Sequence, residues 1–228
     1  MNMRQFQKVP VVTLSNVVFF PNTSLPLYVV DPIYEQLIKD AIADGSPVAV
    51  SLNADEHSME GEFQEPSEIC GIGTPLILER MEDGVLKVLM KGIGKIRLIE
   101  LEYESPYPVY WSEVLKDDTE DTRWVMTKIE RLRLILINWL TENVTNQTER
   151  EQFISTMKSD KHIIDYVTTF LVKDKQIRQL LLENSSFVER VHLLNALIKD
   201  SLPIQEDLLV SDAMKDFMSI DKISKCAH

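Results

Sequence analysis

The chain has 228 residues, enough for two modest domains or one large one, and its 36 acidic and 24 basic residues give a net charge of −12. That charge disfavours non-specific binding to nucleic acid or to an anionic membrane. Two cysteines exclude a disulfide scaffold, no apolar stretch reaches about 18 residues and the N-terminus has no signal-peptide core, so we expect a cytoplasmic protein without a membrane span.

Glycine and proline divide the chain into two parts. All seven glycines lie at or before Gly94, and nine of the ten prolines lie at or before Pro108. Turn-forming residues are dense where strands alternate with loops and rare in helical segments. We therefore predict an α+β fold, with a small β-barrel and one helix in residues 1–115 and an α-helical bundle in residues 116–228.

The first part alternates strand-like runs with turn residues. Six strands are predicted, and they cover residues 9–14, 25–30, 47–52, 69–80, 85–99 and 109–115. One helix interrupts them, because Asp31 can cap its start, Pro32 suits its first turn and Gly45 follows its end. Asp-Gly at 83–84 predicts a hairpin turn, and residues 53–66 form an exposed acidic loop.

Start signals predict the helices of the second part. An acidic run at 117–121 begins a helix that extends to about Glu142. The later helices begin at capping boxes or at single caps, namely Thr148 with Glu151, Asp160, Asp174, and Ser186 with Glu189. Each helix has one apolar face, so we expect the helices to pack together.

The opening residues carry the clearest pattern in the chain. From Val9 to Val30, two strand-like apolar runs are joined by a polar connection that Pro21 and Pro26 delimit. An exposed apolar patch at this connection would bind extended or unfolded chains. The candidate side chains are Phe19, Phe20, Leu25, Leu27, Tyr28, Tyr110 and Trp111. Burial of these side chains in the barrel core is the alternative.

This opening resembles the Lon protease N-terminal domain, also called the Lon substrate-binding domain. The resemblance depends on an ordered set of residues, Val9, Pro10, Leu14, Val17, Val18, Phe20, Pro21, Pro26, Leu27 and Tyr28. It continues through Cys-Gly-Ile-Gly-Thr at 70–74, the strand at 86–98 and Pro-Tyr-Pro at 106–108. Residues 179–183 and 188–191 resemble the closing helices of that family, although Lys95 stands where the family commonly has arginine.

The resemblance implies a PUA-like β-barrel followed by a helical bundle. It also implies a non-catalytic module in proteolysis and protein quality control, one that binds unfolded or client polypeptides or tethers a client to a protease as an adaptor. No phosphate-binding Gly-x-x-x-x-Gly-Lys loop and no recognisable Ser–Lys protease motif is present, so we expect no enzyme activity and no cofactor. The tail after residue 201 offers an apolar helical face for docking on its own bundle or for homodimerisation.

A metal site and an RNA-binding surface are the two other kinds of site to consider. The four histidines lack the spacing of a metal-binding helix, so no metal site is expected. Lys87, Lys91, Lys95 and Arg97 would share one face of an unbroken strand, and PUA-like relatives include RNA binders, so RNA binding is the alternative function. Against it stand the net charge and the absence of aromatic residues within this stripe; moreover, the neighbouring glycines can bulge the strand.

Overall fold

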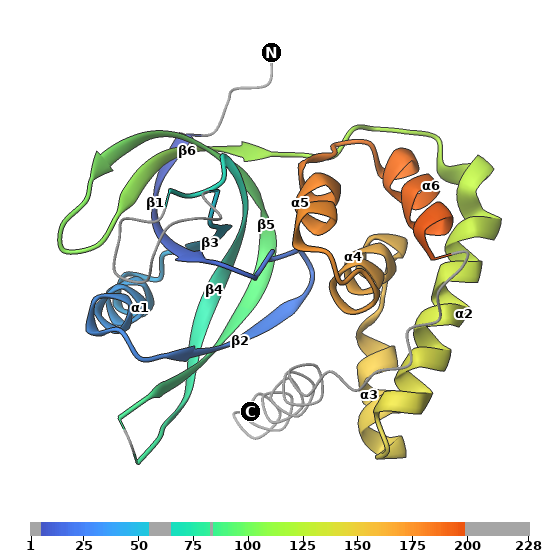
Figure 1. Cartoon of the computed structure of the whole chain (residues 1–228), viewed down its shortest axis with the longest axis horizontal. Helices are drawn as coiled ribbons and strands as arrows, with labels where there is room; N and C mark the ends of the chain where they lie inside the picture. Colours follow the sequence, from blue (N-terminus) through green and yellow to red (C-terminus); the bar gives the residue numbers. More distant parts are fainter. Residues whose placement is uncertain (1–5, 55–64, 83, 199–228) are drawn as a thin grey trace. The chain divides into compact units, whose positions relative to one another are not determined.

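In the computed structural model of the protein, residues 6–54, 65–82 and 84–198 are described, and Figure 1 shows the chain. The chain forms two compact units. The first unit contains the residues up to Lys116 together with Asp174–Glu183, and the second contains Asp117–Lys173 and the residues from Asn184 onward. Most of the predicted acidic loop, the first residue of the 83–84 turn and the C-terminal tail lie outside the described residues.

A mixed six-stranded sheet forms most of the first unit. The strands are β1 (Phe6–Leu14), β2 (Ser24–Val29), β3 (Val48–Leu52), β4 (Ile69–Arg80), β5 (Leu86–Tyr103) and β6 (Val109–Leu115). Their order is β2-β5-β4-β3-β1-β6, and β6 also pairs with β5. Pairing therefore runs from β5 through β4, β3 and β1 to β6 and back to β5, while β2 pairs with β5 alone. Only β1 and β3 run parallel to each other.

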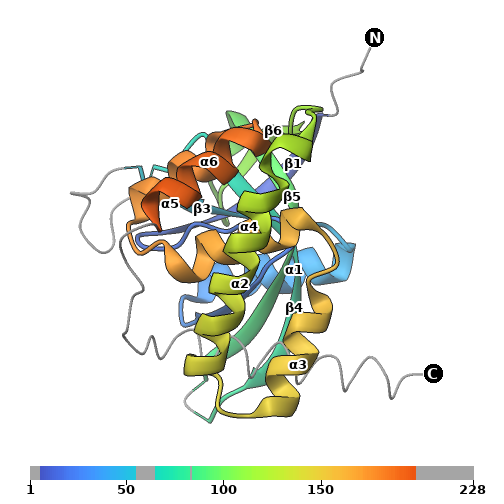
Figure 2. The same ribbon diagram turned by 90° about the vertical axis from the view of Figure 1, so that its right-hand side faces the viewer.

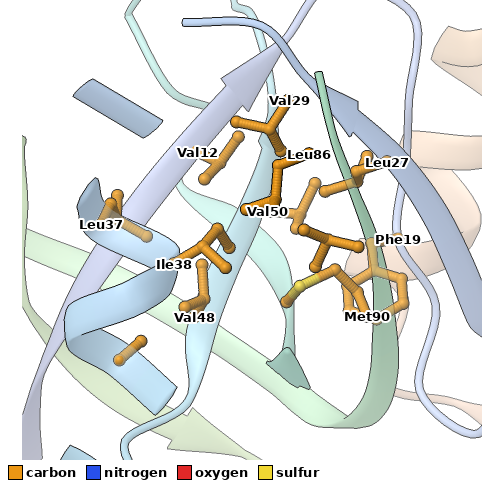
Figure 3. Packing of buried hydrophobic residues seen from close by; sticks show 12 residues of the cluster. Val12, Phe19, Leu27, Val29, Leu37, Ile38, Val48, Val50, Leu86 and Met90 are labelled. Carbon is orange, nitrogen blue, oxygen red and sulfur yellow. The ribbon is translucent and has the colours of Figure 1, made fainter. Parts of the chain in front are cut away.

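Two apolar clusters lie on opposite faces of this curled sheet. Neighbouring residues of a strand point to opposite faces. Accordingly, Val12 and Val50 belong to the first cluster, whereas Val11 and Ala49 belong to the second. Figure 3 shows the first cluster, in which side chains from β1, β2, β3 and β5 meet those of a helix. Burial of both faces explains why β3 is apolar along nearly its whole length.

The helix predicted after Asp31 is confirmed as α1 (Pro32–Asp44). The Asp31 carboxylate accepts a hydrogen bond from the Ile33 N–H at 2.8 Å, which satisfies one of the free amides of the first turn. Gly45 ends the helix with φ of 64°, a conformation that glycine adopts without a Cβ clash. The buried face consists of Leu37, Ile38 and Ala41, which pack into the first cluster.

A polar cluster connects the exposed side of α1 with β4. Glu35 accepts hydrogen bonds from Arg80 of β4 and from Lys39 one helical turn later. The Arg80 hydrogen bond, followed by the Lys39 hydrogen bond, lowers the pKa of Glu35 to about 2. This carboxylate therefore stays ionised well below the ordinary pKa of 4.5 for a glutamate side chain.

The second unit is helical. It contains the 3-10 turn η1 (Thr122–Val125), α2 (Met126–Asn143), α3 (Gln147–Thr156), α4 (Asp160–Leu171) and α6 (Phe187–Leu197). Helices α2, α4 and α6 pack against one another (Figures 1 and 2). Four aromatic rings also pack together, in two stacked pairs, one edge-on pair and one tilted pair, at centroid distances of 4.7 to 5.9 Å; they belong to Trp139, Phe153, Tyr166 and Phe170. The α+β class predicted from the sequence is confirmed.

The caps of these helices agree with the sequence in part. Ser186 caps α6, since its hydroxyl accepts from the Glu189 N–H at 3.0 Å. Helix α3 begins one residue before the predicted Thr148, because Asn146 accepts from the Glu149 N–H at 3.2 Å. Ser159 rather than Asp160 is the cap of α4. Asparagine and serine compete well with the predicted residues as caps, so the cap shifts by two positions in α3 and by one in α4.

A buried ionic cluster holds the second unit together. The Arg190 guanidinium of α6 pairs with Asp117 at 2.7 Å and with Asp165 of α4 at 3.5 Å. Lys161 also pairs with Asp117, at 2.9 Å. Arg190 and Asp165 are both nearly inaccessible to water, so removing one charge would take an ion pair from a charge that stays buried.

Helix α5 (Lys175–Glu183) groups with the strands, although the sequence assigned it to the helical bundle. Gln179 Nε2 donates to the Ile69 carbonyl of β4 at 2.8 Å. Lys95 Nζ of β5 donates to the Leu182 carbonyl at 3.0 Å. The first unit is thus completed by a segment that follows most of the second unit in the sequence.

Candidate functional site

Three of the predicted binding side chains are core residues. Phe19 and Phe20 are each only 1% exposed, and Leu27 is buried in the first cluster with Phe19. The chain carrying Phe19 lies directly on β4, where a Cβ at Gly71 would stand 2.0 Å from the Phe19 carbonyl oxygen. Only glycine permits this approach. These three side chains therefore offer no surface to a partner. They are buried in the core, as the alternative prediction stated.

Leu25 and Tyr110 are partly buried. Leu25 packs against the first cluster and Tyr110 against the second. Burial raises the pKa of the Tyr110 hydroxyl, with smaller contributions from Glu65 and Glu104. Both side chains mainly stabilise the sheet, which leaves Tyr28 and Trp111 as the exposed members of the predicted set.

Tyr28 lies on the outer face of β2 and is 45% exposed. Its strand partner is Lys87 of β5, whose ammonium lies 5.7 Å from the Tyr28 ring centroid. In the next row, Pro26, Leu89 and Leu76 are aligned across β2, β5 and β4. Leu76 is 44% exposed. An aromatic ring and an aliphatic side chain are therefore accessible on neighbouring rows of one three-stranded surface.

Trp111 lies on β6, is 36% exposed and is held by two charged residues. Its indole N–H donates to Glu102 at 2.5 Å, and the Lys8 ammonium lies 4.8 Å from the ring centroid. Lys8 also pairs with Glu102 at 2.5 Å. Hydrogen bonds from Lys8 and then from Trp111 lower the pKa of Glu102. This indole is fixed in orientation and remains open to solvent, as an anchor for a partner would be.

Tyr28 and Trp111 belong to separate surfaces. Strand β2 pairs with residues 86–91 of β5, whereas β6 pairs with residues 95–103 of the same strand. The sequence analysis included both aromatic residues in one set of candidate binding side chains. The structure instead places them beside different halves of β5.

The basic stripe predicted on β5 is interrupted by a bulge. The register with β4 shifts between Gly92 and Gly94, which makes Ile93 an extra residue in β5. Before the bulge, even-numbered side chains of 86–90 belong to the first cluster, and after it those of 96–98 belong to the second. Even-numbered and odd-numbered positions therefore exchange faces at Ile93.

The four basic residues consequently do not share a surface. Lys87 and Lys91 lie on one face, and Lys95 and Arg97 lie on the other. Lys95 is only 4% exposed and bonds to α5, and Arg97 pairs with Glu68 at 2.9 Å. This strand therefore forms no continuous cationic face for an RNA backbone. The prediction that the four basic residues share one face, on which RNA binding depended, is wrong.

No group of three or more metal-ligating side chains was found among the described residues. Within the same ranges, His162 contacts Ser159 and His192 contacts Lys128, each at 2.6 Å. His57 and His228 lie outside the described residues.

Burial raises the pKa of the Cys70 thiol to about 12, so it is not a nucleophile at neutral pH. No helix in the described part of the chain is long and apolar enough to cross a membrane.

Sequence reasoning missed several exposed side chains. Leu76 was expected only as part of a strand. The side of the sheet on which it lies depends on the pairing register, which cannot be read from the sequence. Lys8 and Glu102, which hold Trp111, lie 94 residues apart in the chain. Trp124, in η1 of the second unit, is 84% exposed, although it lies within the helix that the sequence predicts after the acidic run at 117–121. The acidic cap before it predicts a helix start but not its exposure.

The curled sheet with one internal helix and a following helical unit defines the class of N-terminal domains found in Lon proteases. The N-terminal domain of a Mycobacterium avium complex Lon protease has this fold, with a TM-score of 0.62 and 18% sequence identity. The match covers 86% of this chain and 100% of that domain. The Lon N-terminal domain protein from Xanthomonas campestris has a TM-score of 0.58 and 18% identity, over 83% of this chain and 98% of that one.

The chain belongs to the family of the ATP-dependent protease La (LON) substrate-binding domain, whose family model matches residues 8–200. Lon protease 2 of Myxococcus xanthus is 24% identical over 199 residues, which are 84% of this chain and 23% of that protein. The Lon protease of Anaeromyxobacter dehalogenans is 24% identical over 196 residues, or 83% of this chain and 22% of that protein. This chain thus spans less than a quarter of these relatives and matches their non-catalytic part.

Proposed function

We propose that this protein binds unfolded or client polypeptides as a non-catalytic module, and that it presents them to a protease or tethers them as an adaptor. The family match over residues 8–200 is the observation that carries the proposal. A cytoplasmic location, a role in protein quality control and homodimerisation remain parts of this proposal that rest on the sequence.

The exposed aromatic and aliphatic side chains of the first unit support it. Unfolded polypeptides expose the apolar residues that a folded protein buries, and a complementary apolar surface binds them by removing both from water. Tyr28 with Leu76, and Trp111 with the exposed Phe6 of β1, supply such a surface at two places. Bivalent contact along one unfolded chain would raise the apparent affinity without strong binding at either place.

A binding measurement tests the proposal. Fluorescently labelled lysozyme, reduced and carboxamidomethylated so that it stays unfolded, is titrated with the protein and compared with native lysozyme. We expect anisotropy to rise for the unfolded form only. Tyr28→Ala and Trp111→Ala should each weaken binding by about tenfold, within the range of aromatic anchors at protein interfaces.

Trp124→Ala is the matched control, because it removes an even more exposed indole from the second unit. This variant should bind like the unaltered protein. Equal binding to native and unfolded lysozyme, or none to either, would contradict the proposed function. Equal losses for Trp111→Ala and Trp124→Ala would contradict the assignment of binding to the first unit.

A further inference from the structure

Among the described strands, β2 is the one that has an open edge along its whole length. Every other strand in the described sheet takes part in the ring of pairings β5-β4-β3-β1-β6 and has a neighbour on each side over part of its length. Where β4 extends beyond its pairing with β3, Glu35 of α1 bonds to its last residue, Arg80. Strand β2 has β5 on one side, and no strand of the described residues pairs with its other side.

The pairing register shows which backbone groups of β2 lie at this edge. The Thr23 carbonyl accepts a hydrogen bond from the Gly92 N–H at 2.8 Å, so this opposed pair is hydrogen-bonded. Hydrogen-bonded and non-hydrogen-bonded pairs alternate in an antiparallel ladder. Leu25, Leu27 and Val29 therefore direct their N–H and C=O groups to β5. The groups of the intervening residues, Ser24, Pro26 and Tyr28, point away from β5.

Pro26 agrees with this assignment. Proline has no N–H, and at position 26 that absence falls on the open side, so no bond to β5 is lost. The N–H groups of Ser24 and Tyr28 and the carbonyls of Ser24, Pro26 and Tyr28 remain on that side. No hydrogen bond to any of these groups occurs in the part of the chain that the structure describes. All three residues are at least partly exposed.

We propose that an extended segment of an unfolded client polypeptide adds to this edge of β2 as a further strand. The inference rests on the proposed function and specifies how the client is held. Backbone N–H and C=O groups are common to all polypeptides, so strand addition binds clients of unrelated sequence. The Tyr28 ring would then flank alternate side chains of the added strand, which favours clients with an apolar residue at that position.

The same edge fits a second copy of this chain less well. A symmetric pairing of two β2 strands brings in a second Pro26, which again offers no N–H. A proline-free client segment satisfies every group at the edge, whereas another β2 leaves some without a partner. Proline at an edge limits uncontrolled association between sheets. At Pro26 the edge offers only a carbonyl acceptor, so the partner residue opposite it must supply the N–H donor.

Amide hydrogen exchange tests the proposal on the unaltered protein. Exchange is followed by NMR with and without saturating reduced, carboxamidomethylated lysozyme. We expect exchange at the Ser24 and Tyr28 amides to slow at least tenfold when the unfolded chain binds. The amides of Leu25, Leu27 and Val29 already bond to β5 and serve as internal controls whose exchange should change little.

A matched pair of variants gives a second measurement. Ser24→Pro removes one outward N–H without removing a bond to β5, and Ser24→Ala removes only the hydroxyl. The proline variant should bind the unfolded lysozyme about fivefold more weakly, as the loss of one hydrogen bond implies, while the alanine variant should bind as the unaltered protein does. Circular dichroism confirms that both variants are folded.

The outcomes separate the two proposals. Absence of any binding would overturn the proposed function and, with it, strand addition. Binding without slower exchange at Ser24 and Tyr28 would overturn strand addition alone, and so would equal affinities of folded Ser24→Pro and Ser24→Ala. Slower exchange that depends on protein concentration without lysozyme would show that a second copy occupies the edge, against the proposal.

Discussion

Replacing Gly71 by alanine tests how closely the Phe19 backbone lies on β4. The new Cβ would stand 2.0 Å from the Phe19 carbonyl oxygen and 2.8 Å from its carbonyl carbon, whereas ordinary contacts begin at 3.4 Å. A backbone carbonyl cannot rotate away as a side chain can, so the segment carrying Phe19 must move by about 1 Å or more. Overpacking a core typically costs about 1–3 kcal/mol, and we expect about 3 kcal/mol here.

Gly94→Ala is the matched control on the neighbouring strand. Its Cβ would meet the Ile72 side chain at 3.6 Å, an ordinary contact. Restricting the unfolded chain can even stabilise such a variant by about 0.4–1 kcal/mol. The unfolding free energy of Gly94→Ala should therefore lie within about 1 kcal/mol of the unaltered protein.

Urea unfolding measures both variants. In a background with Trp124→Phe and Trp139→Phe, the remaining tryptophan, Trp111, reports on the first unit. The free energy of unfolding then follows from the midpoint and slope of the fluorescence transition. Equal midpoints for Gly71→Ala and Gly94→Ala would refute the view that glycine is required for this close approach.

Three further predictions concern polar contacts. Lys95→Met should lower the unfolding free energy of the first unit by about 1–2 kcal/mol and speed amide exchange in α5, and unchanged exchange there would contradict the bond to that helix. Arg190→Met should destabilise the second unit by about 3–5 kcal/mol in thermal unfolding, because it removes the guanidinium that pairs with two carboxylates, one of them nearly inaccessible to water; a loss below about 1 kcal/mol would contradict this. The hydrogen bonds from Arg80 and Lys39 stabilise the fold fully above the ordinary Glu35 pKa of 4.5, and this stabilisation is lost as pH falls towards about 2. A carboxyl NMR titration of Glu35 should have its midpoint near 2, and a midpoint above 4 would show that these bonds do not form in solution.

Helix α1 shows what the sequence can specify locally. Its cap at Asp31, its proline in the first turn and its end at Gly45 were all predicted, and all three are confirmed. Each signal acts through backbone groups only one to four residues away, so no knowledge of the rest of the fold is needed. The cap of α3 was missed by two residues because Asn146 and Thr148 are both good local caps.

Strand β5 shows where local reasoning fails. Period-two alternation predicts which side chains share a face only while pairing is regular. The bulge at Ile93 reversed that alternation, and the glycines around it indicated a bulge without placing it. The predicted basic stripe therefore became two pairs on opposite faces. Residues that take part in long-range pairing cannot be assigned to a surface from spacing alone.

Local sequence patterns also could not show which of the candidate binding residues are buried and which are exposed. Hydrophobicity selected Phe19, Phe20, Tyr28 and Trp111 together, yet the first two are buried and the other two are exposed. The difference lies in contacts that link distant parts of the chain, such as Gly71 beneath Phe19 and Lys8 beside Trp111. The apolar pattern of α5 likewise predicted a buried face without indicating the unit against which it packs.

The place of α5 has a consequence for biosynthesis. During translation, the six strands leave the ribosome well before residues 174–183 are made. Until those residues emerge, the nascent sheet lacks the partners that Lys95 and the Ile69 carbonyl find on α5. The first unit therefore gains its last helix only after residues 117–173 of the second unit have been made.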